Sequence, residues 1–371
     1  MKKWIKRGIP ALVAALLLRS GCAAQPRETT APTQEATVPA FLSGVAEKPK
    51  NTAPDAWKAN MLMTASDDGS VFGSDHARSE IRTAIFVNNF PEIMPETAWD
   101  ASAAGDGSVI AWVEPGEEGY TLFLAGDGGI NGARACHMLF MNYDNLERVS
   151  FNGCFHTEET EDMRYMFHQC KKLRQVDIET LDTARVTNMY SMFSHCESLT
   201  ALDLSGFNTA NVTDMTNLFF GCSSLADLDV SRFDTANVTS MRGMFAECAA
   251  IGSLDLGSFH TGKVEDMNSM FLNCKSLEEL DISWFSTGMV RDMGKMFYGT
   301  DALTSLDITR FNFSNVTEYT DFMDPGVTYD DEPWENLFAE ICTIREKRTI
   351  YGKMLRMYER KDPAGVRTLR V

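Results

Sequence analysis

A repeat of 26 residues fills the middle of this chain and constrains its fold more than any other feature. Six copies run over residues 155–310 without insertion, and half copies extend the array to residues 136–323. One copy spans residues 207–232, and its Met215 and Cys222 recur at the same step along the array. Self-similarity at this length predicts supersecondary units that stack and bury a shared core.

Each copy carries two hydrophobic patterns. Leu202 and Leu204 alternate with polar neighbours, which predicts a short strand. Val212, Met215 and Leu218 follow in a stripe that is typical of a short helix. The repeat length also lies in the window of about 20–29 residues that leucine-rich repeats occupy. We therefore predict an α/β fold, a leucine-rich-repeat solenoid with a parallel sheet on one face and short helices on the other.

Four short motifs carry a family resemblance. They are F-x-T, V-T-D-M, M-F-x-x-C and L-x-x-L-D-L-S, the last of which occupies Leu199–Ser205. Together they resemble the BspA-type leucine-rich repeat of bacterial surface lipoproteins, also called the lipoprotein-associated repeat. The region from about Ala77 to Ala135 resembles the segment that often precedes such repeats. The resemblance implies a non-enzymatic, cell-surface binding protein, in some relatives an adhesin for host matrix proteins or for other microbes.

The first residues have the order of a secretory signal. Residues 1–22 pass from basic side chains through an apolar run to a Ser-Gly-Cys ending. That ending resembles the lipobox of bacterial lipoproteins, which implies lipidation of Cys22, although Arg19 stands where Leu is usual. An ordinary cleaved signal is the alternative. Residues 23–56 are rich in Thr, Ala, Pro and Glu and are expected to form a flexible tether, so we expect an exported protein anchored by lipid at the bacterial cell surface.

Two further segments flank the repeats. Residues 57–135 contain strand-like runs at 81–87, 109–114 and 120–125, which predict a β-rich N-terminal cap. Residues 324–371 place apolar side chains at helical spacing and end in a basic stretch, which predicts an amphipathic helical cap. The alternative for this basic segment is contact with a membrane or with cell-wall polyanions.

The charge of the chain limits its partners. With 52 acidic against 34 basic residues, the formal net charge is -18. Such a chain does not attract nucleic acid or anionic lipid through its overall field. We expect a macromolecular partner outside the cell, an extracellular protein or a component of a cell surface or matrix. The candidate binding residues lie on or beside the strand face: Arg174, Gln175, Asp227, Arg232, Glu278, Glu279 and Trp284.

Two polar rows recur at the 26-residue step. The cysteine row comprises Cys170, Cys196, Cys222, Cys248 and Cys274, and we interpret it as buried free thiols because the spacing suits neither a zinc site nor disulfides. The aspartate row comprises Asp177, Asp203, Asp229, Asp255, Asp281 and Asp307. We interpret this row as structural, with each carboxylate accepting hydrogen bonds from nearby hydroxyl groups and turn amides. A row of calcium ligands is the alternative.

The residues with reactive side chains form no recognisable catalytic, metal or cofactor motif, so we expect a protein that is not an enzyme and has no cofactor. The predicted function is binding of a macromolecular partner by the repeat surface, in adhesion or in an interaction between host and microbe. A structural envelope protein without a dedicated ligand is the first alternative. An enzyme with an unrecognised site is the second.

Overall fold

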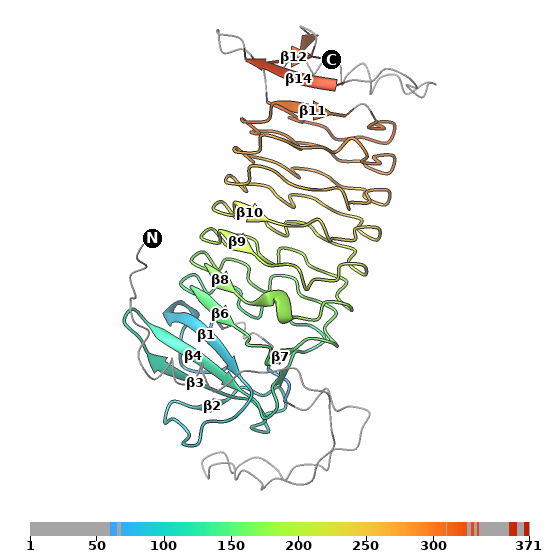
Figure 1. Cartoon of the computed structure of the whole chain (residues 1–371). Coiled ribbons are helices and arrows are strands. Elements are labelled where there is room, and N and C mark those ends of the chain that lie inside the picture. Colours follow the sequence, from blue (N-terminus) through green and yellow to red (C-terminus); the bar gives the residue numbers. More distant parts are fainter. Residues whose placement is uncertain are drawn as a thin grey trace, which may run out of the picture.

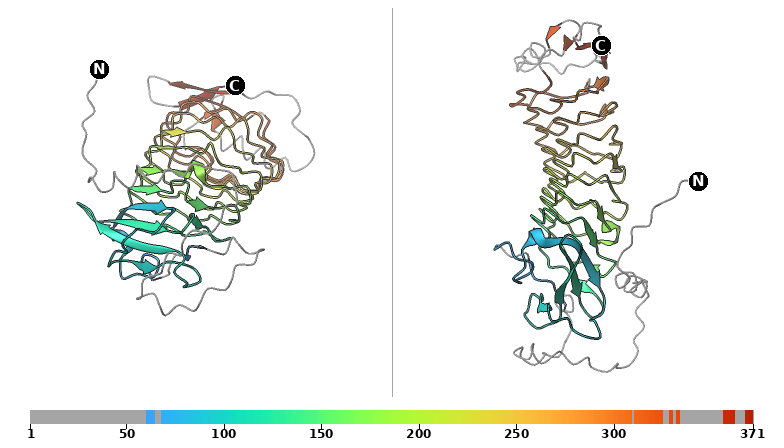
Figure 2. Two further views of the ribbon diagram at one scale, coloured as in Figure 1. Left: turned by 60° about the horizontal axis from the view of Figure 1, so that its bottom comes forward. Right: turned by 90° about the vertical axis from the view of Figure 1, so that its left-hand side faces the viewer.

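The structure is a computed structural model that describes residues 60–64, 68–308 and 310–324, together with four short strands beyond them. The predicted signal, with Cys22, and the predicted tether lie outside the described residues. An extended stack of coils rises from a β-rich base, and Figures 1 and 2 show that the other end carries the last strands. Within the described residues, no helix is long and apolar enough to span a membrane.

A sheet of six strands forms the base of the molecule. Its order is β2 (Trp99–Asp100), β3 (Ile110–Pro115), β4 (Tyr120–Ala125), β1 (Ile81–Val87), β6 (Arg148–Ser150) and β8 (Gln175–Val176). The three strand-like runs expected in this region are therefore confirmed as β1, β3 and β4. Apolar residues fill both faces of the central strands, as Phe86 and Val87 of β1 illustrate, because each face is covered.

Strand β1 lies beside the first repeat strand, β6, in the position that the strand of a preceding copy would occupy. It pairs in parallel with β6, and β6 pairs in parallel with β8 of the first full copy. The register aligns Ala84 with Val149 and Val149 with Val176, so the inward residues continue in one line from the base into the repeats. The base consequently shares one sheet with the first two repeat strands, β6 and β8 (Figure 1).

Successive copies lie on one another at the 26-residue step. Parallel bridges connect one residue of each copy with its counterpart in the next, in the series Ala135, Asp162, Asn188, Asp214, Ser240, Asp266, Asp292 and Glu318, where the first step is 27 residues and each later step is 26. Shorter paired strands occur at β5 (Ile130–Asn131) with β7 (Phe155–His156), and at β9 (Ala201–Leu202) with β10 (Asp227–Leu228). Main-chain hydrogen bonds between coils, such as Met215 N–H to the Ser240 carbonyl at 3.1 Å, continue these ladders.

The prediction of a short helix in each copy is wrong. The described residues contain no α-helix, and their two 3-10 turns are η3 (Arg78–Glu80) and η4 (Ile178–Thr180). The apolar stripe instead follows successive tight turns, in which Leu218 N–H bonds to the Met215 carbonyl at 3.2 Å and Asn217 has a φ of 55°. Positive φ at the third residue of a four-residue turn, here Asn217, is characteristic of a type II turn. Turn spacing and helix spacing both return a side chain to the same face after about three residues.

The core is a set of buried rows that run the length of the stack. Successive phenylalanine rings stack nearly parallel, with centroids 5.4–5.9 Å apart and interplanar angles of 8–15°. The members of this row are Phe140, Phe167, Phe193, Phe219, Phe245, Phe271 and Phe297. Methionines such as Met215 and Met241 are fully buried beside them. The repeated sequence therefore encodes one continuous core.

The predicted C-terminal helix is not supported. A five-stranded sheet occupies this end, with the order β11 (Ser305–Asp307), β14 (Arg356–Lys361), β15 (Arg367–Arg370), β12 (Thr328–Tyr329) and β13 (Glu332–Pro333). Strand β14 pairs antiparallel with β11, the last strand of the repeats. Hydrogen bonding to the open edge of β11 favours an extended partner over a helix. The remaining residues of the predicted helix lie outside the described ones.

Candidate functional site

The outward side of the repeat strands forms a continuous face with changing chemistry. Strand residues alternate between this face and the core, as the exposed Asp227 and Asp229 and the buried Val230 show. The first outward position of each copy is occupied in turn by Gln175, Ala201, Asp227, Ser253 and Glu279, all of them exposed. The inward leucines stay nearly constant while these residues differ, so the fold does not dictate the chemistry of this first outward position. The second outward position, by contrast, is Asp in every copy.

The predicted binding residues all lie at the surface. Arg174, Gln175 and Asp227 are exposed at the strand positions, and so are Glu278 and Glu279 two copies further on. Arg232 and Trp284 lie on the turn that follows the strand, where Trp284 exposes 37% of its surface. The structure thus distributes these seven residues along the stack and gathers them into no enclosed pocket.

The aspartate row makes local hydrogen bonds within its own turns. Oδ1 of Asp203 accepts the backbone N–H of Ser205 at 2.9 Å, and the equivalent bonds at Asp229, Asp255 and Asp281 measure 2.9, 3.0 and 3.1 Å. Hydrogen bonds from the serine partner lower the pKa of Asp203 and of Asp229, with a further contribution from the Arg232 guanidinium. These carboxylates are therefore held ionised and oriented by the backbone.

Asp177 differs from the other members of its row. Its two carboxylate oxygens accept the backbone N–H groups of Phe151 at 2.6 Å and Asn152 at 2.9 Å, both in the preceding coil. Its pKa is raised because burial outweighs these two bonds. The carboxylate closes the irregular turn at Asn152 and Gly153, where the backbone adopts positive φ. The repeat pattern treats all six aspartates alike and therefore did not indicate this special role for the first one.

The cysteine row is a line of buried thiols beside the phenylalanine row. Each Sγ donates to the carbonyl of a phenylalanine in the preceding coil: Cys196 to Phe167 at 3.3 Å, Cys222 to Phe193 at 3.1 Å, Cys248 to Phe219 at 3.1 Å and Cys274 to Phe245 at 3.0 Å. Cys170 donates to the Phe140 carbonyl at 3.0 Å. Burial raises the pKa of Cys222 to about 12, so the thiol stays protonated at neutral pH.

A strip of aromatic and imidazole rings lies on the turn segments of the first three copies. This ring strip consists of Tyr190, Tyr165, His168, His195 and Phe220, each of them partly exposed. Successive ring centroids along the strip are 5.1, 5.3, 6.0 and 5.1 Å apart. The sequence reasoning missed this strip, although aligning the copies at 26 residues places Tyr165, Tyr190 and His195 opposite small or polar residues of later copies.

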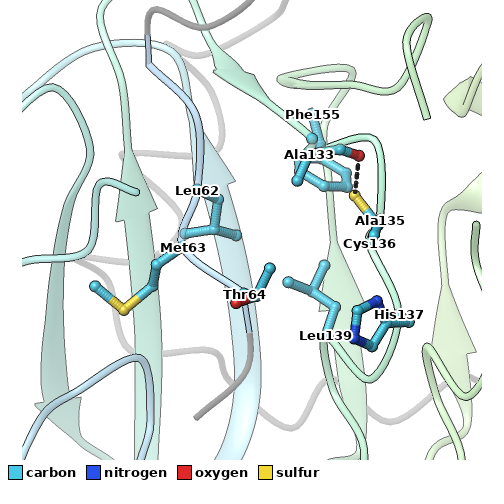
Figure 3. A pocket seen from close by; sticks show the side chains of 10 residues that line it. Leu62, Met63, Thr64, Ala133, Ala135, Cys136, His137, Leu139 and Phe155 are labelled. Atoms are coloured by element: carbon cyan, nitrogen blue, oxygen red, sulfur yellow. Dashed lines mark hydrogen bonds between the residues drawn. The ribbon is translucent and has the colours of Figure 1, made fainter. Parts of the chain in front are cut away.

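A small pocket lies where the first described segment meets the beginning of the repeats. Figure 3 shows Leu62, Met63 and Thr64 on one side, with Cys136 and His137 on the other. The cavity measures about 10 Å³, room for no more than one water molecule. The Cys136 thiol donates to the Ala133 carbonyl at 3.2 Å, and its pKa is raised to about 11 by burial. This pocket therefore suits packing better than ligand binding.

No group of three or more His, Cys, Asp or Glu side chains among the described residues is arranged to hold a metal ion. The aspartates that form the parallel bridges between coils contact backbone and basic groups instead. Oδ1 of Asp214 accepts the Thr216 N–H at 2.9 Å. The Arg242 guanidinium lies 3.4 Å from the Asp266 carboxylate and 3.5 Å from that of Asp292. The Arg242 contacts join neighbouring coils at the surface.

Comparison with curated proteins and with solved structures found no match. A protein family does match, over residues 135–253 and 221–332, which together cover more than half of the chain. The matched region begins at the first half copy and ends beyond the last full one, so it coincides with the stack of 26-residue coils. The chain therefore belongs to the family described as Mycoplasma protein of unknown function, DUF285.

Proposed function

We propose that this protein is an exported, lipid-anchored surface protein whose BspA-type leucine-rich-repeat solenoid binds an extracellular macromolecule without catalysis. The observation that carries the proposal is the continuous outward face. Its inward neighbours repeat almost unchanged, whereas the outward position changes from Gln175 through Asp227 to Glu279. A surface that is free to vary on a constant scaffold suits recognition by shape and charge.

The charge of this face indicates the chemistry of the partner. Exposed carboxylates dominate its third to fifth copies, the acidic half of the face, at Asp227, Asp229, Asp255, Glu278, Glu279 and Asp281. The exposed Arg174 lies nearer the base, and the exposed Trp284 lies beside the acidic half. A basic segment of an extracellular protein fits such a surface, with Trp284 as an apolar or cation–π anchor.

Binding kinetics on the full-length chain test this proposal. The chain is immobilised, and purified extracellular matrix proteins are passed over it at low and at physiological ionic strength. We expect at least one saturable partner whose association slows as salt rises, because the charges on the face are exposed to solvent. No saturable binding at either ionic strength would favour the structural envelope protein.

Charge-neutralising variants locate the surface. The variant Asp227→Asn/Glu278→Gln/Glu279→Gln removes three exposed carboxylates from the strand face. The matched control Glu158→Gln/Glu197→Gln/Glu247→Gln removes three exposed carboxylates that lie on other turns of the same stack. We expect weaker binding in the first variant alone. Equal loss in both variants would mean that net charge governs binding and that the strand face does not.

Lipid attachment is tested separately. Cells that express the chain are labelled with radioactive palmitate, and the Cys22→Ala variant is compared with the wild type. Label on the wild type alone supports the anchor. Label on neither chain, with the protein released into the medium, would favour the ordinary cleaved signal.

A further inference from the structure

We propose that the ring strip formed by Tyr190, Tyr165, His168, His195 and Phe220 binds a neutral linear oligosaccharide. This site lies on the turn segments of the first three copies and shares no residue with the strand face. The inference therefore stands independently of the function proposed above.

The first argument is that the fold does not need these rings. The position of Tyr190 is occupied by Thr216 and Asn268 in other copies, and that of Phe220 by Ala246 in the next copy and by Leu272 and Tyr298 in the two after it. The position of Tyr165 holds Ser191 in the next copy. Since the same backbone turns form around all of these side chains, the packing of the stack does not explain the rings.

The second argument is the geometry of the strip. Main-chain hydrogen bonds from Tyr165 N–H to the Tyr190 carbonyl, 2.9 Å, and from His195 N–H to the Phe220 carbonyl, 2.6 Å, fix the rings across neighbouring coils. Ring contacts are edge-to-face, with interplanar angles of 62–76°. Tyr165 and His168 lie on the first coil, Tyr190 and His195 on the second and Phe220 on the third. With centroid separations of 5.1–6.0 Å, the rings form one patch across three coils that can contact more than one sugar unit.

The third argument is the charge of the strip. None of its five residues carries a carboxylate in a chain with a net charge of -18, and the neighbouring Arg164 is paired with Asp162 at 2.8 Å. Burial and the nearby His195 lower the pKa of His168, which keeps its imidazole neutral at pH 7. Arg164 and Asp214, of opposite charge, both act on Tyr165. Aromatic rings that carry no carboxylate fit a ligand that presents C–H faces and hydroxyl groups.

The strip also offers hydrogen-bonding groups to hydroxyls. Nδ1 of His168 is buried without a partner. The tautomer that leaves this atom as an unprotonated acceptor places the N–H on Nε2. The hydroxyl groups of Tyr165 and Tyr190, which are hydrogen-bonded to each other, and the His195 imidazole complete the polar set. A Cβ at Gly221 would come within 2.7 Å of the His195 ring. The His195 ring therefore occupies space that is open because Gly221 has no side chain.

The test uses the full chain and six neutral hexasaccharides, of the cello-, malto-, xylo-, manno-, laminari- and chito- series, measured by titration calorimetry. We expect saturable binding of at least one of them. In Tyr190→Thr/Phe220→Ala, whose new side chains are those of Thr216 and Ala246, we expect the dissociation constant to rise at least about tenfold. The control Tyr298→Leu introduces the side chain that Leu272 has at the same position of the preceding copy. It changes a ring outside the strip and is expected to bind as the wild type does.

Three outcomes would overturn the proposal. The first is that none of the six sugars binds at millimolar concentration. The second is that the double variant binds as tightly as the wild type while keeping the wild-type melting temperature. The third is self-association: if the wild type sediments as a dimer and the double variant as a monomer, a second copy of the chain occupies the strip. Loss of partner binding by the strand-face variant, with sugar binding unchanged, separates this proposal from the function proposed above.

Discussion

The hydroxyl group of Thr209 connects two coils because it hydrogen-bonds both main-chain groups of one residue, the N–H and the carbonyl of Asp234. Its Oγ1 donates to the Asp234 carbonyl at 3.0 Å and accepts the Asp234 backbone N–H at 2.8 Å. The side chain is buried, and the same pair of bonds recurs at Thr183, Thr235, Thr261 and Thr287. A buried threonine row therefore satisfies backbone groups that the turns leave unpaired.

Replacing Thr209 with the isosteric valine should destabilise the stack. The substitution leaves an N–H and a carbonyl of Asp234 without their partner, at a cost of about 1–3 kcal/mol in the free energy of unfolding. Urea unfolding measures the loss. Thr213→Val is the control, since Thr213 is exposed and its hydroxyl makes one bond, to the Thr187 carbonyl at 3.1 Å. Equal stability of the two variants would contradict the assigned role.

The phenylalanine row should dominate the stability of each coil. Phe219 is fully buried between Phe193 and Phe245, with both centroid distances at 5.9 Å. We expect Phe219→Ala to cost about 3–5 kcal/mol in the free energy of unfolding, the usual range for a deleted core ring. Phe220→Ala, one residue along but partly exposed, should cost well under half as much. Denaturant unfolding of the two variants compares them, and similar losses would exclude the row as the main source of stability.

Gly206 should tolerate no side chain. A Cβ at this position would collide with the Glu179 carbonyl oxygen, part of the 3-10 turn η4, which is a local feature of the preceding coil. Gly206→Ala must shift this turn, and we expect a loss of about 1–3 kcal/mol. Gly262→Ala is the matched control, because no atom lies within 4 Å of its added Cβ. Thermal melting distinguishes the two, and an unchanged Gly206→Ala melting temperature would contradict the collision.

The buried thiols should be unreactive in the folded protein and should make it sensitive to alkali. Burial raises the pKa of Cys222 and Cys274 to about 12, above the value of 9.0 expected when the chain unfolds. The unfolded state therefore loses these protons first as pH rises. The stabilisation is complete below about pH 9 and is lost progressively as the pH rises from there toward 12.

Two measurements check the thiol row. A disulfide reagent such as Ellman's should label none of the five thiols of the row at pH 8 in the native state and all of them in urea. The free energy of unfolding should fall between pH 8 and pH 10, with a smaller slope in Cys222→Ala. Rapid native labelling would show that the row is open to solvent.

Calcium should not stabilise the protein through the aspartate row. Oδ1 of Asp203 already accepts the Ser205 N–H at 2.9 Å, and each carboxylate of the row belongs to a different coil. We expect the same melting temperature in calcium chloride and in a chelator, for the wild type and for Asp203→Asn. A rise of several degrees in the wild type, reversed by the chelator and absent in Asp203→Asn, would establish a calcium site instead.

The sequence allowed the register of the stack to be predicted, because buried rows such as Met215 and Phe219 can only align at a constant step. It did not separate turn from helix. Val212, Met215 and Leu218 recur every third residue, and this spacing fits both structures when local propensity is neutral. The positive φ at Asn217 and Gly221 decides for turns, and Asn and Gly at those positions were the available signal.

The surface could be predicted less well than the core. The exposed positions of Asp227 and Glu279 follow from alternation along a strand, which local sequence contains. The ring strip depends instead on residues from three coils, such as Tyr165 and Tyr190, that meet only after the coils stack. The C-terminal strands were missed for a related reason, since β14 is extended because β11 presents an edge to it.

The constant step of the ladders has a consequence for how such a chain can change in length. The bridges at Asp214, Ser240 and Asp266 are equivalent, so deletion of 26 consecutive residues would rejoin every row with its counterpart. Tandem duplication of one copy would lengthen the protein in the same way. The gene can thus gain or lose surface in whole units while β1 and β14 continue to cover the two ends.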